Sequence, residues 1–349
     1  MSTNDERGRA ARVRLSAMTL EQKIASLLML HVPGTDPGRI HDFTAEHQPG
    51  GLILMPDNIP PSTEALASLT AAAHTDAEFP VLVAIDQEGG FVRRIVSDDH
   101  PSSVTLKHRP ASETHSAFSS RAAMLAAAGV TVNFGIVGDV TNDPTSFIYD
   151  RALGVTYAES AERVSAAIAG ERGAVRSTVK HFPGHGRTPG DSHTSIPETD
   201  SDADTWWRTD AVPFAAAITA GVDLVMVGHL RYTAVDDTPA TLSTAWNRIL
   251  RTRLGFHGVI ITDDMFMVRD SGLPEYQDAS ENAIRALVAG NTMLLYVLRG
   301  DRTVDGTDTG TLIAGIAAAV HDGRIPIDVI DDAALRILRL RASIGRATP

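Results

Sequence analysis

The chain contains no cysteine and no long run of apolar residues. The first absence excludes disulfides and thiolate chemistry, and it fits a reducing compartment without proving one. The second absence argues against a membrane-spanning helix, which needs about 20 consecutive apolar residues. Residues 1–23 are polar and charged and lack the apolar stretch of a secretory signal, so we expect a cytoplasmic protein.

Positive charge is also scarce, because 31 Lys and Arg residues stand against 43 Asp and Glu residues, which gives a net charge of −12. Nonspecific nucleic-acid binding needs a basic face, so we expect no nucleic-acid partner. A local basic pocket for a small substrate is compatible with this charge. The oligomeric state does not follow from the sequence, which is compatible with a monomer.

The composition suits one large α/β domain. Hydrophobic residues make up 43% of the 349 residues, enough for a substantial core. A (β/α)8 barrel takes about 250 residues and more with insertions. No low-complexity tract and no interdomain linker interrupts the chain. We therefore predict a single domain over residues 1–349, in which residues 1–15 are the candidates for flexibility.

Short apolar, β-branched runs alternate with alanine-rich helical patterns along the chain. The strand-like runs lie at 26–32, 50–54, 81–86, 130–134, 175–181, 222–229, 258–263 and 292–297. The helical patterns lie at 37–47, 62–75, 112–128, 157–171, 208–220, 243–254, 277–289, 308–321 and 327–343. Runs that are apolar nearly throughout indicate parallel strands buried on both faces. Eight β-then-α units predict a closed (β/α)8, TIM-type barrel.

Polar residues occur where several of these strand-like runs end. Asp86, Lys180–His181, His229 and Asp263 end their runs, and Asp139 closely follows another. In a (β/α)8 barrel, side chains at the carboxyl ends of the strands converge on one mouth. We therefore expect these side chains to share a site at that mouth.

The segment from Lys180 to His193 is the strongest single signal of a functional site. It combines a lysine, three histidines and an aspartate with closely spaced glycines and prolines, which prevent a regular helix or strand. Binding and catalytic residues are often carried on such loops. The alternative interpretation is a solvated loop whose histidines occur by chance.

Two aspartates of this set suggest specific chemistry. Asp263 ends a buried strand, where a fixed carboxylate can act as a nucleophile, a general base or a metal ligand. The structural alternative is a helix N-cap, which we favour for the neighbouring Asp264. Asp191 stands two residues before His193, so it can hold the tautomer of that imidazole and prepare it to pass a proton.

The segment after the third predicted strand adds further groups. Asp86 is followed by the pair Gly89 and Gly90, which would let the backbone approach a ligand closely. Arg94 follows, and Arg151 lies in a later segment. Each arginine taken alone is more often a surface salt-bridge partner than a ligand-binding residue.

These segments together resemble glycoside hydrolase family 3, and most closely its single-domain β-N-acetylglucosaminidases of the NagZ type. The resemblance covers nearly the whole chain, and the spacing from Lys180 to His193 is its most specific part. It is carried, in family order, by residues 18–23, 86–90, 150–151, 180–186, 191–193, 239–243, 254–258 and 262–264.

The resemblance implies a retaining exo-β-N-acetylglucosaminidase that acts through a covalent glycosyl-aspartate. In that scheme Asp263 is the nucleophile, and His193, oriented by Asp191, is the acid/base. The sugar hydroxyls and the 2-acetamido group would be held by Asp86, Arg94, Arg151, Lys180 and His181. The implied partner is a small N-acetylglucosaminide, with no cofactor and no metal, and peptidoglycan recycling is the implied process.

The loop and the departures from the family pattern carry further expectations. We hypothesise that Gly184, Gly186 and Gly190 let the loop swing His193 over a bound sugar. Phe91 stands where the family usually has arginine, and residues 265–274 differ from the usual continuation after the aspartate pair. Both departures could reshape the sugar or leaving-group subsite.

Alternatives remain open at this point. A metal-dependent barrel hydrolase would use His181, His185, His193 and Asp191 as ligands, although their spacing matches no recognised zinc signature. Because a neutral imidazole base repels an anion less than a carboxylate would, phosphorolysis is also conceivable. Another β-glycosidase of the family and a non-catalytic sugar-binding barrel are the remaining alternatives. Muropeptide fragments, chitin oligomers and metabolite glycosides all fit as substrates.

Overall fold

The strands of the protein form a nearly closed parallel barrel. The computed structural model describes residues 3–298 and 307–344. Its main sheet has eight strands in the order β10-β1-β2-β3-β4-β5-β7-β9. Their bounds are β1 Leu28–Leu30, β2 Gly51–Leu54, β3 Leu82–Ile85, β4 Val132–Val137, β5 Arg176–Phe182, β7 Leu224–Val227, β9 Val259–Thr262 and β10 Leu294–Tyr296. Each strand overlaps one predicted run, so the predicted TIM-type barrel is confirmed.

The barrel closes at a short seam between β9 and β10. An isolated parallel bridge joins Ile261 to Met293 there. The N–H of Thr262 donates to the carbonyl of Met293 at 3.1 Å, and the N–H of Met293 donates to the carbonyl of Ile260 at 3.0 Å. The remaining pairs of neighbouring strands are joined by parallel ladders, and those of β4 with β5 and of β5 with β7 contain a register shift. The barrel is therefore less regular at this seam than the prediction of a fully closed sheet implied.

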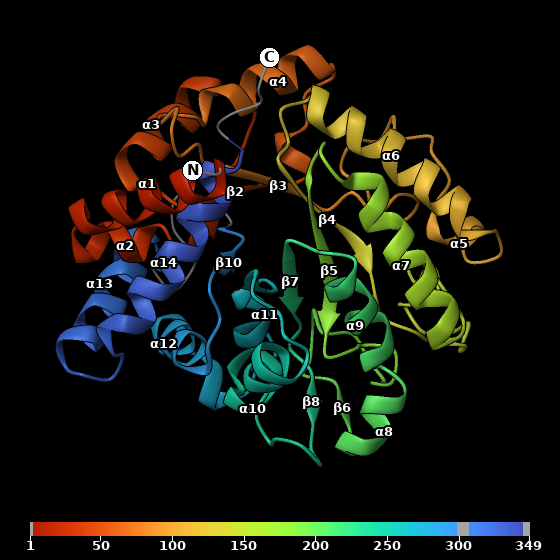
Figure 1. Ribbon diagram of the computed structural model, residues 1–349. Helices are drawn as coiled ribbons and strands as arrows, with labels where there is room; N and C mark the ends of the chain where they lie inside the picture. The colour runs from red at the N-terminus through yellow and green to blue at the C-terminus, as the bar shows by residue number, and fades with distance from the viewer. Residues whose placement is uncertain (1–2, 299–306, 345–349) are drawn as a thin grey trace.

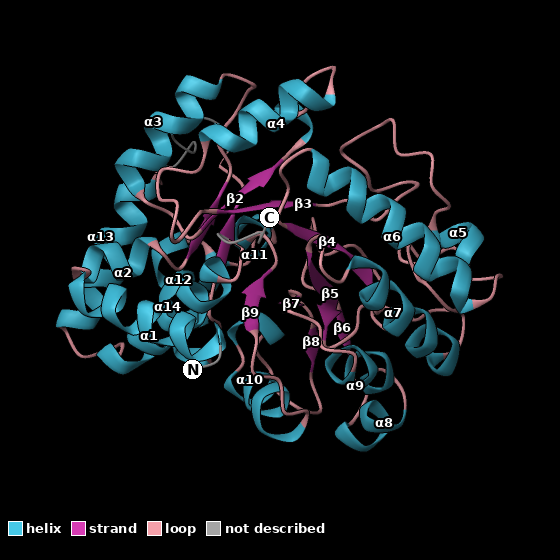
Figure 2. Ribbon diagram, turned by 45° about the horizontal axis from the view of Figure 1, so that its top comes forward, coloured by secondary structure: helices cyan, strands magenta, loops and turns pink. Residues whose placement is uncertain are grey.

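Helices surround the strands, as Figure 2 shows. Those that match predicted patterns are α3 Pro37–His47, α4 Thr63–Ala72, α6 Ala111–Ala127, α7 Tyr157–Glu171, α9 Ala211–Thr219, α10 Thr244–Arg248, α12 Ala279–Ala289, α13 Thr309–His321 and α14 Ile327–Ala342. A π-helical turn, Ile249–Arg253, extends α10. Further short elements are α2 Leu20–Ala25, α5 Ser103–Leu106, α8 Ala203–Arg208, α11 Met265–Asp270 and the two-stranded ladder of β6 Glu198–Thr199 with β8 Arg231–Tyr232.

The chain begins with a helix in the region that we expected to be a candidate for flexibility. Helix α1 spans Thr3–Ala17 and lies beside α14 in Figure 1. Ala11 is completely buried in a small cluster with Phe79 and Leu338. Arg14 forms an ion pair with Asp76 at 2.5 Å. These contacts hold the helix against the barrel, although its sequence has little apolar periodicity.

The core explains why the strand-like runs are apolar almost throughout. Every residue of β1, β2, β3, β7, β9 and β10 is buried. Strands covered by helices on one face and by packed side chains on the other have no solvent-facing side, so their sequences do not alternate. Within the described residues, no helix is both long and apolar enough to cross a membrane.

Candidate active site

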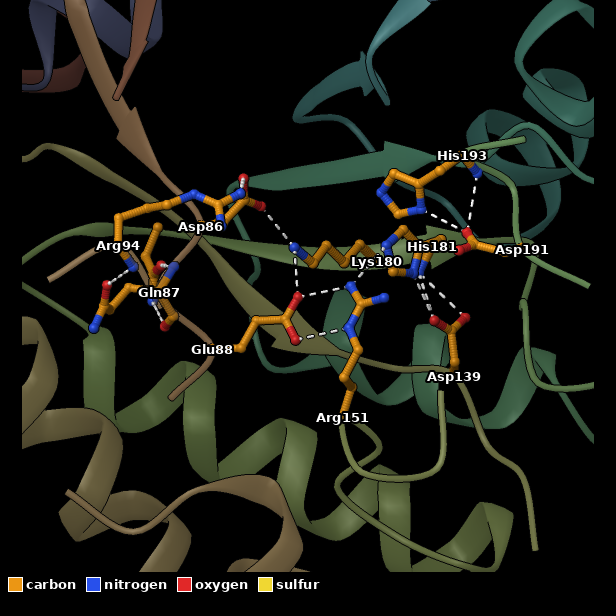
Figure 3. A network of polar contacts seen from close by, with 11 residues as sticks. Asp86, Gln87, Glu88, Arg94, Asp139, Arg151, Lys180, His181, Asp191 and His193 are labelled. Carbon is orange, nitrogen blue, oxygen red and sulfur yellow. Dashed lines mark hydrogen bonds and ion pairs between the residues drawn. The ribbon is translucent and has the colours of Figure 1, made fainter. Parts of the chain in front are cut away.

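Five strands deliver polar side chains to one end of the barrel. Asp86 directly follows β3, Lys180 and His181 lie near the end of β5, and Asp263 directly follows β9. Asp139 and His229 lie two residues beyond β4 and β7. Because the strands are parallel, their carboxyl ends share one rim. Figure 3 shows Asp86, Asp139, Lys180 and His181 close together at this rim. The predicted convergence is therefore present.

Lys180 lies at the centre of this network. Its side chain is 2% exposed, and its Nζ lies 2.8 Å from Asp86 Oδ1 and 2.8 Å from Glu88 Oε1. Asp86 also accepts a hydrogen bond from Arg94 Nη2 at 3.1 Å through its other oxygen. Burial alone would lower the pKa of Lys180, but the charges of Asp86 and Glu88 outweigh it and raise the pKa. Lys180 is therefore a buried, permanently charged hydrogen-bond donor.

Glu88 joins Lys180 to Arg151. Arg151 Nη2 donates to Glu88 Oε1 at 2.8 Å, and Arg151 Nε donates to Oε2 at 3.0 Å. Burial would raise the pKa of Glu88, but the charges of Arg151 and Lys180 lower it to about 2. The carboxyl group is therefore ionised at neutral pH.

The side chain of Gln87 holds the backbone after β3 in place by hydrogen bonds. Its Oε1 accepts hydrogen bonds from the backbone N–H groups of Arg94 at 2.9 Å and Ile95 at 3.0 Å. Gly89 and Gly90 lie against side chains of the protein itself, and the expected approach of their backbone to a ligand stays a prediction. A Cβ at Gly89 would collide with the Arg121 guanidinium and one at Gly90 with Ser102, and both glycines have positive φ angles. Their lack of side chains allows a tight turn against the protein itself.

His181 is held by a buried carboxylate. Its Nδ1 lies 2.6 Å from Asp139 Oδ2, and its backbone N–H also donates to Asp139. Arg151 Nη2 lies 3.3 Å from His181 Nε2, and a guanidinium can only donate. Nε2 therefore accepts, which places the ring proton on Nδ1. Burial would raise the pKa of Asp139, but His181 and His185 lower it.

A second imidazole–carboxylate pair lies in the open. His193 Nδ1 and Asp191 Oδ1 are 2.5 Å apart, and their side chains are 62% and 47% exposed. The backbone N–H of His193 donates to the same oxygen at 3.0 Å. Partial burial would raise the pKa of Asp191, but these contacts with His193 lower it. Asp191 thus holds the ring by Nδ1, as its spacing in the sequence predicted, and leaves Nε2 to the solvent side.

The carboxylate of Asp263 is anchored at the end of β9. Its backbone N–H donates to the carbonyl of Val227 at 3.0 Å, and its Oδ1 accepts from the N–H of Asp264 at 2.8 Å. Burial would raise its pKa, but His181, His229 and the Asp264 N–H lower it below the usual range. Asp263 is therefore an ionised carboxylate at neutral pH, as a nucleophile must be.

Asp264 has the structural role that we favoured for it. Its side chain accepts from the N–H of Phe266 at 3.2 Å and caps the N-terminus of α11, which confirms the prediction. Its Oδ1 also accepts from the N–H of Val297 at 3.1 Å, so it ties β9 to the segment after β10. The two neighbouring aspartates therefore divide into one that faces the mouth and one that serves the backbone.

His229 joins the segment after β7 to the segment after β9. Its Nδ1 lies 2.8 Å from Thr241 Oγ1 and its Nε2 lies 2.9 Å from the carbonyl oxygen of Asp264. Burial lowers its pKa, and its ring interacts electrostatically with Asp263, His181 and His193. Through the two contacts of its ring nitrogens, His229 ties the segment after β7 to the backbone beside Asp263.

The loop after β5 has a fixed first part and an open second part. Gly184 O accepts from Tyr232 Oη at 2.6 Å, and the backbone N–H of His185 donates to Asp139 Oδ1 at 2.7 Å. A Cβ at Gly186 would collide with the backbone of Val140, so this glycine serves close packing. Only Gly190 of the three proposed hinge glycines lies beyond the fixed part, next to Asp191 and with φ 94°.

The geometry disfavours the metal-site alternative. His181 Nε2 faces the Arg151 guanidinium, and the remaining ring nitrogens that bond do so to Asp139, Thr188 and Asp191. A dication beside that guanidinium would be repelled. A search of residues 3–298 and 307–344 finds no group of three or more His, Asp or Glu side chains that could hold a metal ion.

Comparison with known proteins identifies the family. The family model described as "Glycosyl hydrolase family 3 N terminal domain" matches residues 19–340. A protein named beta-hexosaminidase from Methylobacillus flagellatus is 32% identical over 327 residues, which cover 87% of this chain and 90% of that protein. This chain belongs to glycosyl hydrolase family 3. The family predicted from the motifs is therefore confirmed.

Solved structures of family 3 proteins have the same fold. A family 3 beta-N-acetylglucosaminidase from Paenibacillus sp. str. FPU-7 superposes with a TM-score of 0.86 at 31% identity, covering 95% of this chain. This chain spans only 64% of that Paenibacillus protein. A beta-N-acetylhexosaminidase from Beutenbergia cavernae has a TM-score of 0.79 at 27% identity, with coverage of 93% and 98% of the two chains.

The sequence does not indicate a specific function for three residues of the site. These residues stand within a motif or near the ends of strand-like runs: Glu88, Asp139 and His229. For Glu88 a signal was available, because it stands two residues after Asp86 and extended chains place alternate side chains on one side. For Asp139 and His229, position at the strand ends was the only signal.

Proposed function

We propose that this protein is a retaining exo-β-N-acetylglucosaminidase. The proposal is supported by an anchored, ionised carboxylate, Asp263, at the end of β9 and by an exposed imidazole, His193, on the loop after β5. Asp191 holds His193 by Nδ1, so Nε2 is the nitrogen that exchanges a proton with the substrate. The names of the family 3 relatives support N-acetylglucosamine as the sugar.

The proposed reaction proceeds in two steps. Asp263 attacks the anomeric carbon while protonated His193 gives its Nε2 proton to the leaving oxygen, which forms a glycosyl-aspartate and neutral imidazole. Water then enters, His193 takes its proton, and the resulting attack on the anomeric carbon releases the sugar and regenerates Asp263.

The polar network supplies donors and acceptors for the sugar. Lys180 uses two of its three N–H groups on Asp86 and Glu88, which leaves the third for a substrate oxygen. We assign the sugar hydroxyls and the 2-acetamido group to Asp86, Arg94, Arg151, Lys180 and His181. Three cations against two carboxylates in this part of the site fit a neutral ligand rich in oxygen acceptors.

The test is hydrolysis of an aryl β-N-acetylglucosaminide by the Asp263→Ala variant. We expect the loss of at least about 10⁴-fold in kcat, with an unchanged circular dichroism spectrum, because the covalent route needs this carboxylate. Substantial residual turnover would overturn the assignment. If the variant is inactive, a panel of aryl glycosides that differ at C2 and C4 identifies the sugar that the wild type prefers. Muropeptides and chitin oligomers, tested in the same way, identify the preferred aglycone.

Phosphorolysis is a second candidate reaction, favoured by the imidazole acid/base. A neutral His193 leaves the mouth less negative than a third carboxylate would, so phosphate can compete with water for the glycosyl-enzyme. Turnover is compared in phosphate and in an inert buffer of equal ionic strength. Formation of sugar 1-phosphate would establish phosphorolysis, and identical rates without that product would exclude it.

A further inference from the structure

Glu88 has an unusual set of partners for a buried carboxylate. Its side chain is 1% exposed, and both of its oxygens are occupied. Oε1 is shared between Lys180 Nζ and Arg151 Nη2, each at 2.8 Å, and Oε2 binds Arg151 Nε at 3.0 Å. Both partners belong to the cations that we assign to the sugar. Glu88 therefore joins Lys180 to Arg151, as Figure 3 shows.

The bonds to Glu88 determine which donors remain for a ligand. Lys180 keeps one N–H group, because Asp86 and Glu88 take the other two. Arg151 donates hydrogen bonds to Glu88 from Nε and Nη2. The same Nη2 lies 3.3 Å from His181 Nε2. Within the described residues its Nη1 makes no hydrogen bond to protein. The carboxylate thus orients one donor of Lys180 and one amino group of Arg151.

Electrostatics makes this carboxylate difficult to replace. Lys180 and Arg151 repel each other, and the charge of Arg151 by itself lowers the pKa of Lys180. Asp86 lies against Lys180 and Arg94 and makes no ion pair with Arg151. Without the negative charge at Glu88, the two cations would repel each other more strongly and move apart, because Glu88 is bonded to both of them.

We propose that Glu88 is a positioning residue that fixes the spacing of Lys180 and Arg151 and thereby sets the selectivity of the site for the sugar's substituents. The inference rests on the proposed function, because the two cations must contact the sugar for their spacing to matter. Glu88 itself is too enclosed to contact the substrate, so its effect passes through Lys180 and Arg151.

The experiment compares the wild type with Glu88→Gln on aryl β-glycosides altered singly at C2, C3, C4 and C6. Glutamine keeps the shape but replaces one acceptor oxygen by an amino group that faces a cation. We expect kcat/KM for the N-acetylglucosaminide to fall about 100-fold, with discrimination between it and at least one altered sugar reduced about tenfold. Glu88→Asp, which keeps the charge, should recover part of that discrimination.

Asp223→Asn is the matched control. Asp223 forms a partly buried ion pair with Arg176 at 3.3 Å at the amino ends of β5 and β7, the opposite end of the barrel from the mouth. The loss of this ion pair should lower the melting temperature without changing the ratios of kcat/KM between sugars. Two results would overturn the proposal and leave Glu88 a purely structural residue: a fall in kcat/KM of Glu88→Gln that is the same for every sugar, or ratios that change equally in Asp223→Asn.

Binding of free N-acetylglucosamine and of glucose, measured by calorimetry in the same variants, separates this inference from the proposed function. Wild-type protein that binds N-acetylglucosamine but cleaves no glycoside would refute the enzymatic function. The positioning role would still be judged by whether Glu88→Gln loses the preference for N-acetylglucosamine over glucose. Wild-type protein that neither binds nor cleaves would overturn both proposals. If Glu88→Gln does not fold, Glu88→Asp is judged by the same ratios, and unchanged ratios would refute the inference.

Discussion

The segment from Lys180 to His193 contributes the histidines of two imidazole–carboxylate pairs that have almost the same bond and opposite surroundings. Nδ1 lies 2.6 Å from the carboxylate in the pair of His181 with Asp139, and 2.5 Å in the pair of His193 with Asp191. The first pair is 7% and 0% exposed, whereas the second is 62% and 47% exposed. The hydrogen bond alone therefore does not separate their roles.

The two histidines differ in the contacts of their second ring nitrogen, Nε2. His181 Nε2 is occupied by Arg151, so this ring is locked between two neighbours and can orient a ligand but has little freedom to exchange protons. His193 Nε2 makes no hydrogen bond to any described residue. A proton-transfer group needs a nitrogen that is open to the substrate and to water. We infer from this comparison that the buried pair holds its segment in place, whereas the exposed pair is the one suited to transfer a proton.

Among variants of these two pairs, the largest effect is expected from His193→Ala. We expect kcat/KM for a glycoside with a poor leaving group to fall about 10³-fold, since proton donation by a positioned acid contributes that order of acceleration. The free energy of unfolding should change by less than about 0.5 kcal/mol, because the side chain is exposed. Steady-state kinetics and urea denaturation measure the two quantities. A large loss of stability would show that the open pair is also structural.

Asp139→Asn tests the buried pair. We expect the free energy of unfolding to fall by about 3 kcal/mol, because His181 would lose the charge of its buried partner and three N–H groups share this carboxylate. Since the folded-state pKa of Asp139 is lowered, its contribution is present above its unfolded pKa of about 4 and is lost as pH falls. Urea denaturation at pH 7 and pH 4 measures both. Equal stability of Asp139→Asn and wild type would contradict the holding role.

His185 adds a pH dependence to the buried half of the segment. Burial lowers its pKa to about 4, so the unfolded chain binds more protons than the folded protein between about pH 6.5 and 4. The stability of the folded protein should therefore fall on acidification through this window, by roughly 2–3 kcal/mol. His185→Gln should remove that part of the slope in urea denaturation. An identical pH slope in the variant would contradict the burial effect.

The smallest effect is expected from Asp191→Asn. The ring of His193 should keep its position through a weaker hydrogen bond, so we expect about a tenfold fall in kcat/KM with no measurable change in stability. Kinetics at several pH values measures the activity, and Asp139→Asn provides the contrast in stability. If Asp191→Asn lost as much free energy of unfolding as Asp139→Asn, the claim that only the buried pair stabilises the fold would be contradicted.

Much of the architecture could be predicted because buried parallel strands have a simple sequence pattern. All eight runs were located, and polar residues such as Asp86 and Asp263 indicated where the strands end. Strand β4 extends to Val137, beyond the predicted end at Phe134, because Gly135 interrupts the β-branched pattern without ending the ladder. Helix α1 was missed because its few apolar side chains pack on α14, which is distant in the sequence.

The sequence indicated most of the residues that form the site, but it did not indicate how deeply each of them is buried. Nothing in the local sequence indicates that His181 is buried and His193 exposed, since both follow polar residues in one glycine-rich segment. The difference arises because His181 lies in β5 and meets Asp139 across the ladder to β4, whereas His193 follows the last tight backbone contact of the loop. Glu88 was missed for the same reason, because Lys180 and Arg151 reach it from other strands and loops.

The division of labour between the two pairs is tested most directly by the leaving-group dependence of His193→Ala. kcat/KM is measured for two aryl β-N-acetylglucosaminides, one with a poor and one with a strongly activated leaving group. The account predicts a fall of about 10³-fold for the first and less than about tenfold for the second, because an activated phenolate leaves without a proton. Equal losses on both substrates would contradict the assignment of His193 as the group that protonates the leaving oxygen.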